Sequence, residues 1–377
     1  MIRVLQEVAT MDAGGVERML YDYYGNLDNE EIAFDFVIFD REKEGIFEKP
    51  LKEKGCRFHC VPRVTGLGIR NMAALWKIFR NGDYQVVHAH RGSRSFFVLL
   101  TAWAAGVPVR ICHSHIAFEP DKNPIKHLKT MVFKHLCRIF ATDLFACGDD
   151  AARFMWGTSD PRKVRKLTNA IDTGRFHRAL ADREELRRSL GVEDTFVLGT
   201  VARIDVQKNP MYMLKIAKAV KESGKKAVFL VVGSGPMEEE VKQRAHEMGL
   251  DGFVRFLGVR QDIPQLLAAM DLFLLPSLFE GLPVTLIETQ ASGLPALVSD
   301  RVTREMDKVG LIRFLPLDDD AACWADAIAN AVINEDRSAY AGKVLAAGYD
   351  ISDQARKFGE FYLQRLSSHY RRNEYEK

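Results

Sequence analysis

The stretch FVLGTVARIDVQKNPMYMLKIAKAVKES, residues 196 to 223, decides the fold. Its first seven residues form a mostly apolar run that predicts a buried strand, and a polar loop follows. From Pro210 to Ser223 the apolar residues have the spacing of an amphipathic helix. Asn209 is a residue type that caps helices, and proline suits a first helical turn. A strand, a loop and a helix in this order form the repeating unit of a parallel α/β sheet.

The same unit recurs along the chain. Other strands are predicted at Arg3–Val8, Ile32–Phe39, Arg57–Val61, Val86–His90, Arg110–His115, Asp143–Cys147, Ala227–Val232, Val254–Leu257, Leu272–Leu275 and Ala296–Ser299. Other helices are predicted at Val16–Asn26, Gly45–Lys54, Asn71–Asn81, Arg94–Ala105, Ile125–Phe140, Met237–Gly249, Ile263–Met270, Val284–Gly293 and Ala321–Asn334. This alternation indicates two similar Rossmann-like α/β domains with a cleft between them.

The chain length supports that division, because 377 residues exceed one ordinary core. Residues 167–188 lack a strong apolar period and are the best linker. We therefore expect an N-terminal domain at 1–168 and a C-terminal domain at 169–350. Residues 351–377 are expected to form a C-terminal helix whose apolar stripe packs back on the N-terminal domain.

Composition excludes several classes of protein. The net charge of +2 argues against a general nucleic-acid binder. No stretch reaches the roughly 18 apolar residues of a spanning helix, and the start MIRVLQEVAT does not resemble a signal peptide. The six scattered cysteines show no zinc-finger spacing and are expected to be reduced thiols, buried in the case of Cys56 and Cys60. A cytoplasmic location is therefore expected.

The strongest candidate for a binding site is VARIDVQKNP, residues 201 to 210. A strand ends at Arg203, and a helix begins after Lys208. A helix start presents free N–H groups that suit an anion. Arg203 can bind phosphate oxygens with its guanidinium fork, and Lys208 can add a point charge. The alternative is a pair of solvated surface cations.

A second candidate is LLPSLFEGLPVTLIE, residues 274 to 288. Glu280 precedes a helix that Pro283 starts, and Glu288 lies within that helix. The two carboxylates suit either acid–base catalysis or recognition of hydroxyl groups, with the amides of Gly281 and Leu282 holding phosphate between them. We favour recognition, with Glu280 accepting hydrogen bonds from a sugar. The alternative is a pair of ordinary helix carboxylates.

Two glycine loops are weaker signals. MDAGGVER, residues 11 to 18, contains Gly14 and Gly15 between the first strand and the first helix, where backbone could approach a phosphate closely. GSGPMEEE, residues 233 to 240, lacks the spacing of a dinucleotide or P-loop motif. A plain tight turn explains either loop equally well.

Histidines cluster as HAH at 88 to 90 and HSH at 113 to 115, both at strand ends. Alternation puts His113 and His115 on one face of their strand. We expect at least one of the four to line the cleft, and no metal site. The aspartates at 318 to 320 are interpreted as a helix start rather than a metal motif.

Together these segments resemble the retaining glycosyltransferases of family 4, which have the GT-B fold and include bacterial enzymes of capsular and exopolysaccharide synthesis. The resemblance spans nearly the whole chain and rests on GGVER, HAH, GVPVRICHSH, NAIDTGRF, VARIDVQKN, GSGP, PSLFEGLPVTLIETQASGLP and SDRVTREMD. The spacing from Glu280 to Glu288 matches the paired-glutamate motif of that family. Ala202 and Ala170 stand where many members have glycine.

The resemblance implies a role for each motif residue. Arg203 and Lys208 would bind the donor diphosphate, Glu280 the transferred sugar, and Glu288 the ribose. Further contacts implied are Gly15 at the distal phosphate and one histidine beside the sugar, with His113 favoured over His115. His113 and Glu280 are thus the expected catalytic residues. The family is metal-independent, so no cofactor is expected.

The implied reaction moves a sugar from a nucleoside-diphosphate sugar, expected to be UDP-linked, to a glycan or lipid-linked acceptor. Two alternatives are a sugar-nucleotide epimerase of the same fold and a catalytically silent subunit of a polysaccharide assembly complex. Residues 123–140 form a basic amphipathic segment, which suits peripheral contact with the inner face of the plasma membrane. The alternative for this segment is a helix that covers the sheet with a solvated basic face.

Overall fold

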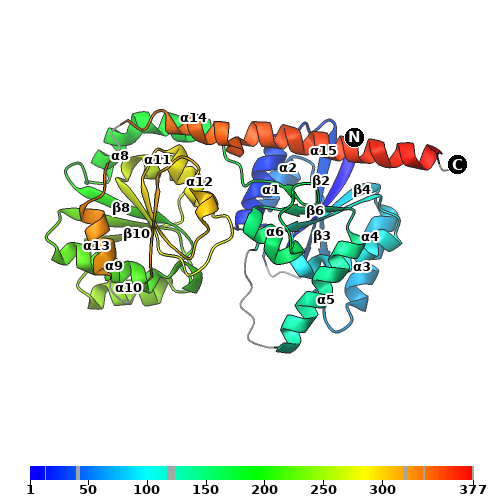
Figure 1. Ribbon diagram of the computed structural model, residues 1–377, viewed down its shortest axis with the longest axis horizontal. Coiled ribbons are helices and arrows are strands. Elements are labelled where there is room, and N and C mark those ends of the chain that lie inside the picture. The colour runs from blue at the N-terminus through cyan, green and yellow to red at the C-terminus, as the bar shows by residue number, and fades with distance from the viewer. Residues whose placement is uncertain (13, 40–42, 117–123, 318–320, 334–335, 376–377) are drawn as a thin grey trace. The chain divides into compact units, whose positions relative to one another are not determined.

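The computed structural model describes residues 1–12, 14–39, 43–116, 124–317, 321–333 and 336–375 (Figure 1). It divides into two compact units. Unit 1 comprises Met1–Ala170 with Ile351–Lys377, and unit 2 comprises Ile171–Asp350. The aspartates at 318 to 320 lie outside the described residues, so their expected place at a helix start stays a prediction.

Unit 1 is built on a parallel sheet of seven strands in the order β3-β2-β1-β4-β5-β6-β7. These strands are β1 (Ile2–Glu7), β2 (Ile32–Phe39), β3 (Phe58–Val61), β4 (Tyr84–Ala89), β5 (Val109–Ser114), β6 (Asp143–Ala146) and β7 (Arg165–Lys166). Its helices are α1 (Gly15–Gly25), α2 (Glu48–Glu53), α3 (Ile69–Asn81), η1 (Gly92–Ser95), α4 (Phe96–Ala104), α5 (Pro124–Phe140), α6 (Asp149–Trp156) and α15 (Ile351–Tyr375).

The helix α15 completes the core of unit 1 although it ends the chain. Its residues Ala355, Phe358, Tyr362 and Leu366 are buried with side chains of β1, β2 and α1. The ring of Phe358 lies edge-on to Tyr23, with 5.5 Å between the centroids. Figure 1 shows α15 in red along the blue elements of unit 1. The prediction that the C-terminal helix packs back on the first part of the chain is therefore confirmed.

Unit 2 has a parallel sheet of six strands in the order β10-β9-β8-β11-β12-β13. These strands are β8 (Phe196–Val201), β9 (Ala227–Val232), β10 (Val254–Gly258), β11 (Leu272–Leu275), β12 (Ala296–Ser299) and β13 (Ile312–Leu315). Its helices are α7 (Thr173–Ala179), η2 (Leu180–Asp182), α8 (Arg183–Ser189), η3 (Val206–Lys208), α9 (Pro210–Glu222), α10 (Glu238–Glu247), α11 (Ile263–Ala269), α12 (Val284–Ala291), η4 (Arg304–Met306), α13 (Ala322–Ala329), α14 (Tyr340–Val344) and η5 (Leu345–Tyr349).

Each sheet reverses its strand order at one position, as doubly wound sheets do. In unit 1 the reversal lies between β1 and β4, and in unit 2 it lies between β8 and β11. Loops at the carboxyl ends of the strands beside such a reversal open a crevice that commonly binds ligands. The predicted α/β architecture is thus confirmed. The loops expected to bind ligands are those that follow β1, β4, β8 and β11.

Some sequence expectations need correction. Within the expected linker the structure forms α7, a helix of seven residues that is too short for its apolar period to stand out. Cys56 is buried as expected, but Cys60 is exposed, because it lies on β3 at the edge of the sheet. No helix among the described residues is long and apolar enough to cross a membrane.

Candidate active site

In unit 2 both predicted ligand loops lie at the reversal of strand order. The loop of Arg203 and Lys208 follows β8, and the loop of Glu280 follows β11. The amide of Leu278 donates to the carbonyl of Gln207 at 2.8 Å, which joins the two loops directly. Two motifs that the sequence separates by about 70 residues therefore form one local structure.

The loop after β8 holds its two cations differently. The Asp205 carboxylate accepts from the Lys208 amide at 3.2 Å and so caps the short helix η3. Arg203 extends outward with 68% of its side chain exposed, and its Nε lies 3.7 Å from Asp205 Oδ2. Asn209 has a positive φ of 54° immediately before α9. As predicted, Asn209 is the N-cap residue of α9 and the helix begins at Pro210, although the Asn209 side chain makes no capping hydrogen bond.

Lys208 and Glu280 form an ion pair in this structure. The Lys208 ammonium lies 2.5 Å from Glu280 Oε1, and only 16% and 5% of the two side chains are exposed. Ser277 Oγ donates to the same oxygen at 2.6 Å, while Gln207 Nε2 donates to Oε2 at 3.1 Å. Three donors thus orient the Glu280 carboxylate, which leaves it suited to accepting further hydrogen bonds rather than to moving toward a substrate as a nucleophile.

The remaining residues of the second motif surround the start of α12. Leu282 is buried with 7% exposure, and Gly281 and Glu288 are half-buried. Helix α12 begins at Val284 after Pro283, so Glu288 lies in its second turn. The structure therefore brings Arg203, Lys208, Glu280 and the start of α12 to one end of one sheet.

The GSGP loop supports this region through its backbone. A Cβ on Gly235 would lie 2.3 Å from the carbonyl oxygen of Ile204, and one on Gly233 would lie 2.0 Å from that of Ala202. The amide of Ile204 donates to the carbonyl of Ser234 at 3.0 Å. These glycines are required because the loop after β8 packs against them, a constraint that the sequence alone did not reveal.

In unit 1 the glycine loop and the HAH histidines lie at the reversal of strand order, and the HSH histidines lie one strand further along the sheet. Gly14 precedes α1, and Gly15 is its first residue, after β1. A Cβ on Gly15 would meet no described atom within 4 Å, so packing does not require glycine there. The HAH residues end β4, the neighbour of β1, and the HSH residues end β5.

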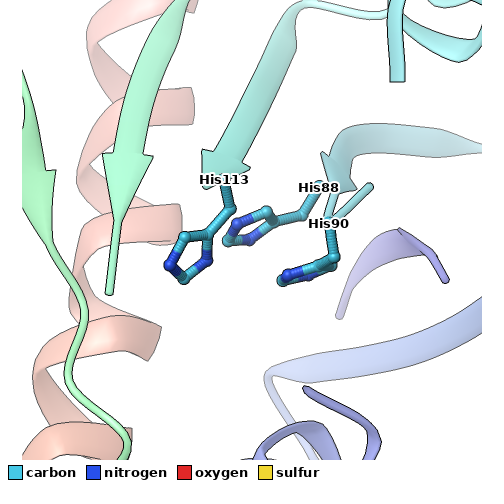
Figure 2. A group of neighbouring side chains, drawn as sticks. All are labelled: His88, His90 and His113. Carbon is cyan, nitrogen blue, oxygen red and sulfur yellow. The ribbon is translucent and has the colours of Figure 1, made fainter. Parts of the chain in front are cut away.

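The four histidines form one stacked cluster, three members of which appear in Figure 2. His88 and His90 stack with 4.2 Å between ring centroids, and His113 and His115 lie 3.9 Å apart. Burial lowers the pKa of His115 to about 3 and holds the pKa values of the other three well below 6.5. The cluster is therefore neutral over the physiological range of pH.

The ligand atoms of His88, His90 and His113 approach within 4.8 Å of one another, close enough to consider a metal ion. However, both nitrogens of His90 are already bonded, Nδ1 to His115 at 2.9 Å and Nε2 to Gln6 Oε1 at 2.8 Å. His88 Nδ1 is also engaged, because it lies 2.9 Å from Tyr362 Oη. The arrangement fits a hydrogen-bonded cluster better than a metal centre.

The two HSH histidines differ in access. His113 is fully buried, and neither of its ring nitrogens has a partner among the described residues. His115 is half-buried and lines a pocket of about 240 Å³ at the carboxyl ends of β4 and β5. Other lining residues include Arg91, Arg94 and Lys134. Of the two, His115 is the one that a ligand could reach within unit 1.

The first part of helix α5 is exposed, whereas its second part packs against η1, α4 and β5. Residues 124–129 are exposed all round, including Ile125 at 66% and Leu128 at 65%. Only Cys137 in the last third of the helix is buried. Figure 1 shows the helix extending away from the rest of unit 1. The exposed half of α5, residues 124–131, carries apolar and basic residues together.

Comparison with known proteins agrees with this architecture. Residues 13–175 match the family described as Glycosyltransferase Family 4, and residues 195–334 match Glycosyl transferases group 1. EpsF of Bacillus subtilis, named as a glycosyltransferase, is 36% identical over 339 residues, which cover 87% of each chain. An Escherichia coli enzyme named UDP-Gal:alpha-D-GlcNAc-diphosphoundecaprenol alpha-1,3-galactosyltransferase is 32% identical over 302 residues, which cover 76% of each chain.

Solved structures show the same fold. Anabaena HepE, in complex with UDP and glucose, superposes with a TM-score of 0.78 at 19% identity and covers 97% of this chain and all of that one. WaaG, a glycosyltransferase of lipopolysaccharide biosynthesis, gives a TM-score of 0.66 and covers 95% of this chain and 99% of that one. The two doubly wound units therefore have the GT-B fold. The chain belongs to the family 4 glycosyltransferases and is a glycosyltransferase enzyme.

Proposed function

We propose that this enzyme transfers a sugar from a UDP-linked donor to a glycan or lipid-linked oligosaccharide acceptor, with retention of configuration, in bacterial capsular or exopolysaccharide synthesis. The observation that carries the proposal is the joining of Lys208 and Glu280 at the strand reversal of unit 2. The Escherichia coli relative, whose name specifies UDP-Gal and a diphosphoundecaprenol acceptor, supports the two substrate classes.

In this proposal the donor binds to unit 2. The exposed guanidinium of Arg203 meets the diphosphate, and Lys208 of the same loop adds a second positive charge. Glu280 accepts hydrogen bonds from the sugar, and Glu288 does so from the ribose. The amides of Gly281 and Leu282, just before α12, face the phosphates.

The reaction is a front-face displacement. The bond from the sugar C1 to the diphosphate oxygen breaks, and the diphosphate leaves with the electron pair. The acceptor oxygen bonds to C1 on the same face, and its proton passes to a leaving phosphate oxygen. This path is supported by the three donors that hold Glu280, because they disfavour its use as a covalent nucleophile. Arg203 and Lys208 stabilise the leaving charge.

We also propose that the reaction needs no metal ion. Two cationic side chains and the N-terminus of α12 can offset the charge of the diphosphate. Activity that survives extensive treatment with EDTA supports this, and activity restored only by a divalent cation contradicts it.

The exposed half of α5 is proposed to contact the inner face of the plasma membrane. Ile125, Leu128 and Met131 expose more than half of their surface, among Lys126 and Lys129. A helix of this kind binds an anionic lipid surface in two ways: its apolar side chains are buried among the lipids, and its lysines pair with the negative headgroups. Such contact would bring the enzyme to a lipid-linked acceptor.

The test starts with nucleotide sugars screened for thermal stabilisation of the protein, because a bound donor raises the unfolding temperature. The stabilising donor is then incubated with lipid-linked acceptors, and the products are identified by mass spectrometry. A product heavier than the acceptor by one sugar supports the proposal. Conversion of the donor alone into an isomer would instead identify an epimerase, and the lack of any donor binding would fit a silent subunit.

A further inference from the structure

A chain of side-chain hydrogen bonds crosses the buried centre of unit 1. His115 Nε2 lies 2.9 Å from His90 Nδ1, and His90 Nε2 lies 2.8 Å from Gln6 Oε1. Gln6 Nε2 donates to Tyr362 Oη at 3.3 Å, and Tyr362 Oη lies 2.9 Å from His88 Nδ1. The bonded chain therefore joins the pocket-lining His115 to helix α15.

The proton positions in this chain follow from one amide. Gln6 Oε1 can only accept, so His90 Nε2 must carry the proton that it receives. A neutral imidazole carries one proton, which makes His90 Nδ1 an acceptor. His115 Nε2 must then be the donor to it. Gln6, His90 and Tyr362 are buried and His115 is half-buried, and loss of solvent keeps the histidines neutral and the Tyr362 hydroxyl protonated by raising its pKa.

The result is a defined hydrogen-bond acceptor on a residue that lines the pocket. With its proton on Nε2, His115 has a bare lone pair on Nδ1. No described group bonds to that nitrogen, and His115 lines the pocket. Had the Gln6 amide the opposite orientation, every bond would reverse and His115 would offer an N–H to the pocket instead.

We propose that Gln6 and Tyr362 are positioning residues for sugar transfer: they fix the tautomer of His115, so that a hydroxyl of a sugar bound in the pocket donates to Nδ1. Gln6 sets the polarity of the chain, and the Tyr362 hydroxyl completes it by accepting from Gln6 Nε2. Neither residue lines the pocket. This inference rests on the proposed function for its chemistry, but the tautomer can be measured without activity.

The first test is nitrogen-15 NMR of protein with labelled histidines, in which the His115 signals are assigned by their loss in His115→Gln. The expected result is a proton on Nε2 and a bare Nδ1. In Gln6→Leu the constraint is removed, and we expect part or all of the His115 population to carry its proton on Nδ1. A wild-type protein with the proton on Nδ1 of His115 overturns the proposal.

The second test uses kinetics. Gln6→Leu is expected to lower kcat about tenfold, the value of one hydrogen bond made in the transition state, while KM for the donor stays unchanged. Tyr362→Phe should lower kcat less, because it removes one hydrogen bond of the Gln6 amide but keeps the amide itself. This variant replaces Gln6→Leu in the test if Gln6→Leu fails to fold. The matched control is Asn71→Leu, which removes another buried amide, one that donates to the Pro62 carbonyl at 2.7 Å.

The control should lose stability but keep both kcat and the tautomer of His115. If Gln6→Leu and Tyr362→Phe change stability alone, as Asn71→Leu does, the residues are merely structural and the proposal fails. A wild-type enzyme that transfers no sugar would contradict the proposed function. It would also contradict a role of Gln6 and Tyr362 in transfer. The nitrogen shifts report on the tautomer in either case, so the two failures can be told apart.

Discussion

Lys208 and Glu280 are 72 residues apart in the sequence, yet their side chains form an ion pair. The sequence predicted both as ligands of one donor, through the loops that carry them. It could not predict their ion pair, because spacing along a chain does not determine how two long side chains meet. The pair means that the two residues must be tested together.

We predict that Lys208→Ala abolishes sugar transfer, with a loss of more than about a hundredfold in kcat, because the leaving diphosphate loses a cation. The protein should still fold but lose about 2 kcal/mol of stability, since a nearly buried carboxylate loses its counter-ion. Steady-state kinetics and urea unfolding measure the two effects. Lys218→Ala, on an exposed face of α9, should change neither.

The double variant Lys208→Ala with Glu280→Gln separates charge balance from catalysis. It should regain most of the stability, because the unpaired carboxylate is gone, while transfer stays lost. Full activity in Lys208→Ala would show that the assignment of the diphosphate contact is wrong.

Gly15 gives a second prediction at the scale of single residues. Because a Cβ at this position meets no described atom, Gly15→Ala should leave the stability unchanged or slightly raised, as expected for glycine to alanine in a helix. If backbone there approaches a phosphate, the added methyl should raise KM for the donor or lower kcat by about tenfold or more. Gly342→Ala, which also meets open space within a helix, is the control. Equal activity in both variants would leave Gly15 with no role at the donor.

At the scale of elements, periodicity predicted the interior strands to within about two residues. It missed short elements such as β13 and α6, whose lengths of four and eight residues carry little periodic signal. The sequence also predicted that at least one of the four histidines lines the cleft. It did not predict that His113 is fully buried, because alternation tells which face a residue shares and not how deep that face lies. The hydrogen bond between Gln6 and Tyr362 joins residues 356 positions apart, which no local sequence pattern can predict.

Helix α5 carries the prediction at this scale. Ile125→Glu with Leu128→Glu should abolish flotation with liposomes that contain anionic lipid, because both side chains are about two-thirds exposed and would lose their apolar contact with the bilayer. The free energy of unfolding should stay within about 0.5 kcal/mol of the wild type. Wild-type protein that fails to float with anionic liposomes would rule out the membrane contact.

For the whole molecule, the histidine cluster predicts how stability depends on pH. The folded state cannot protonate His88, His90, His113 or His115 readily, whereas the unfolded chain takes up protons near pH 6.5. The contribution of these histidines to the free energy of unfolding is therefore at its full value above about pH 6.5. It falls as the pH drops below that value, by up to about 1.4 kcal/mol per histidine per pH unit.

Urea unfolding between pH 7.5 and 5.5 measures this slope for unit 1. His113→Phe should reduce the slope by the contribution of one proton, about 1.4 kcal/mol per pH unit. No hydrogen bond is lost in this variant, because neither ring nitrogen of His113 is bonded. An unchanged slope in that variant would mean that His113 takes up its proton in the folded protein.

The position of α15 has a consequence for how the protein is made. Unit 1 needs Phe358 and Tyr362 in its core, but the 180 residues from Ile171 to Asp350 are translated before them. At 5–20 residues per second this is a wait of roughly 10 to 40 seconds on the ribosome. During that time the strands of unit 1 expose an apolar surface, while unit 2 can fold without interruption. Of the two units, the one whose strands are synthesised first is thus completed last, and it is the unit on which we expect chaperones to act.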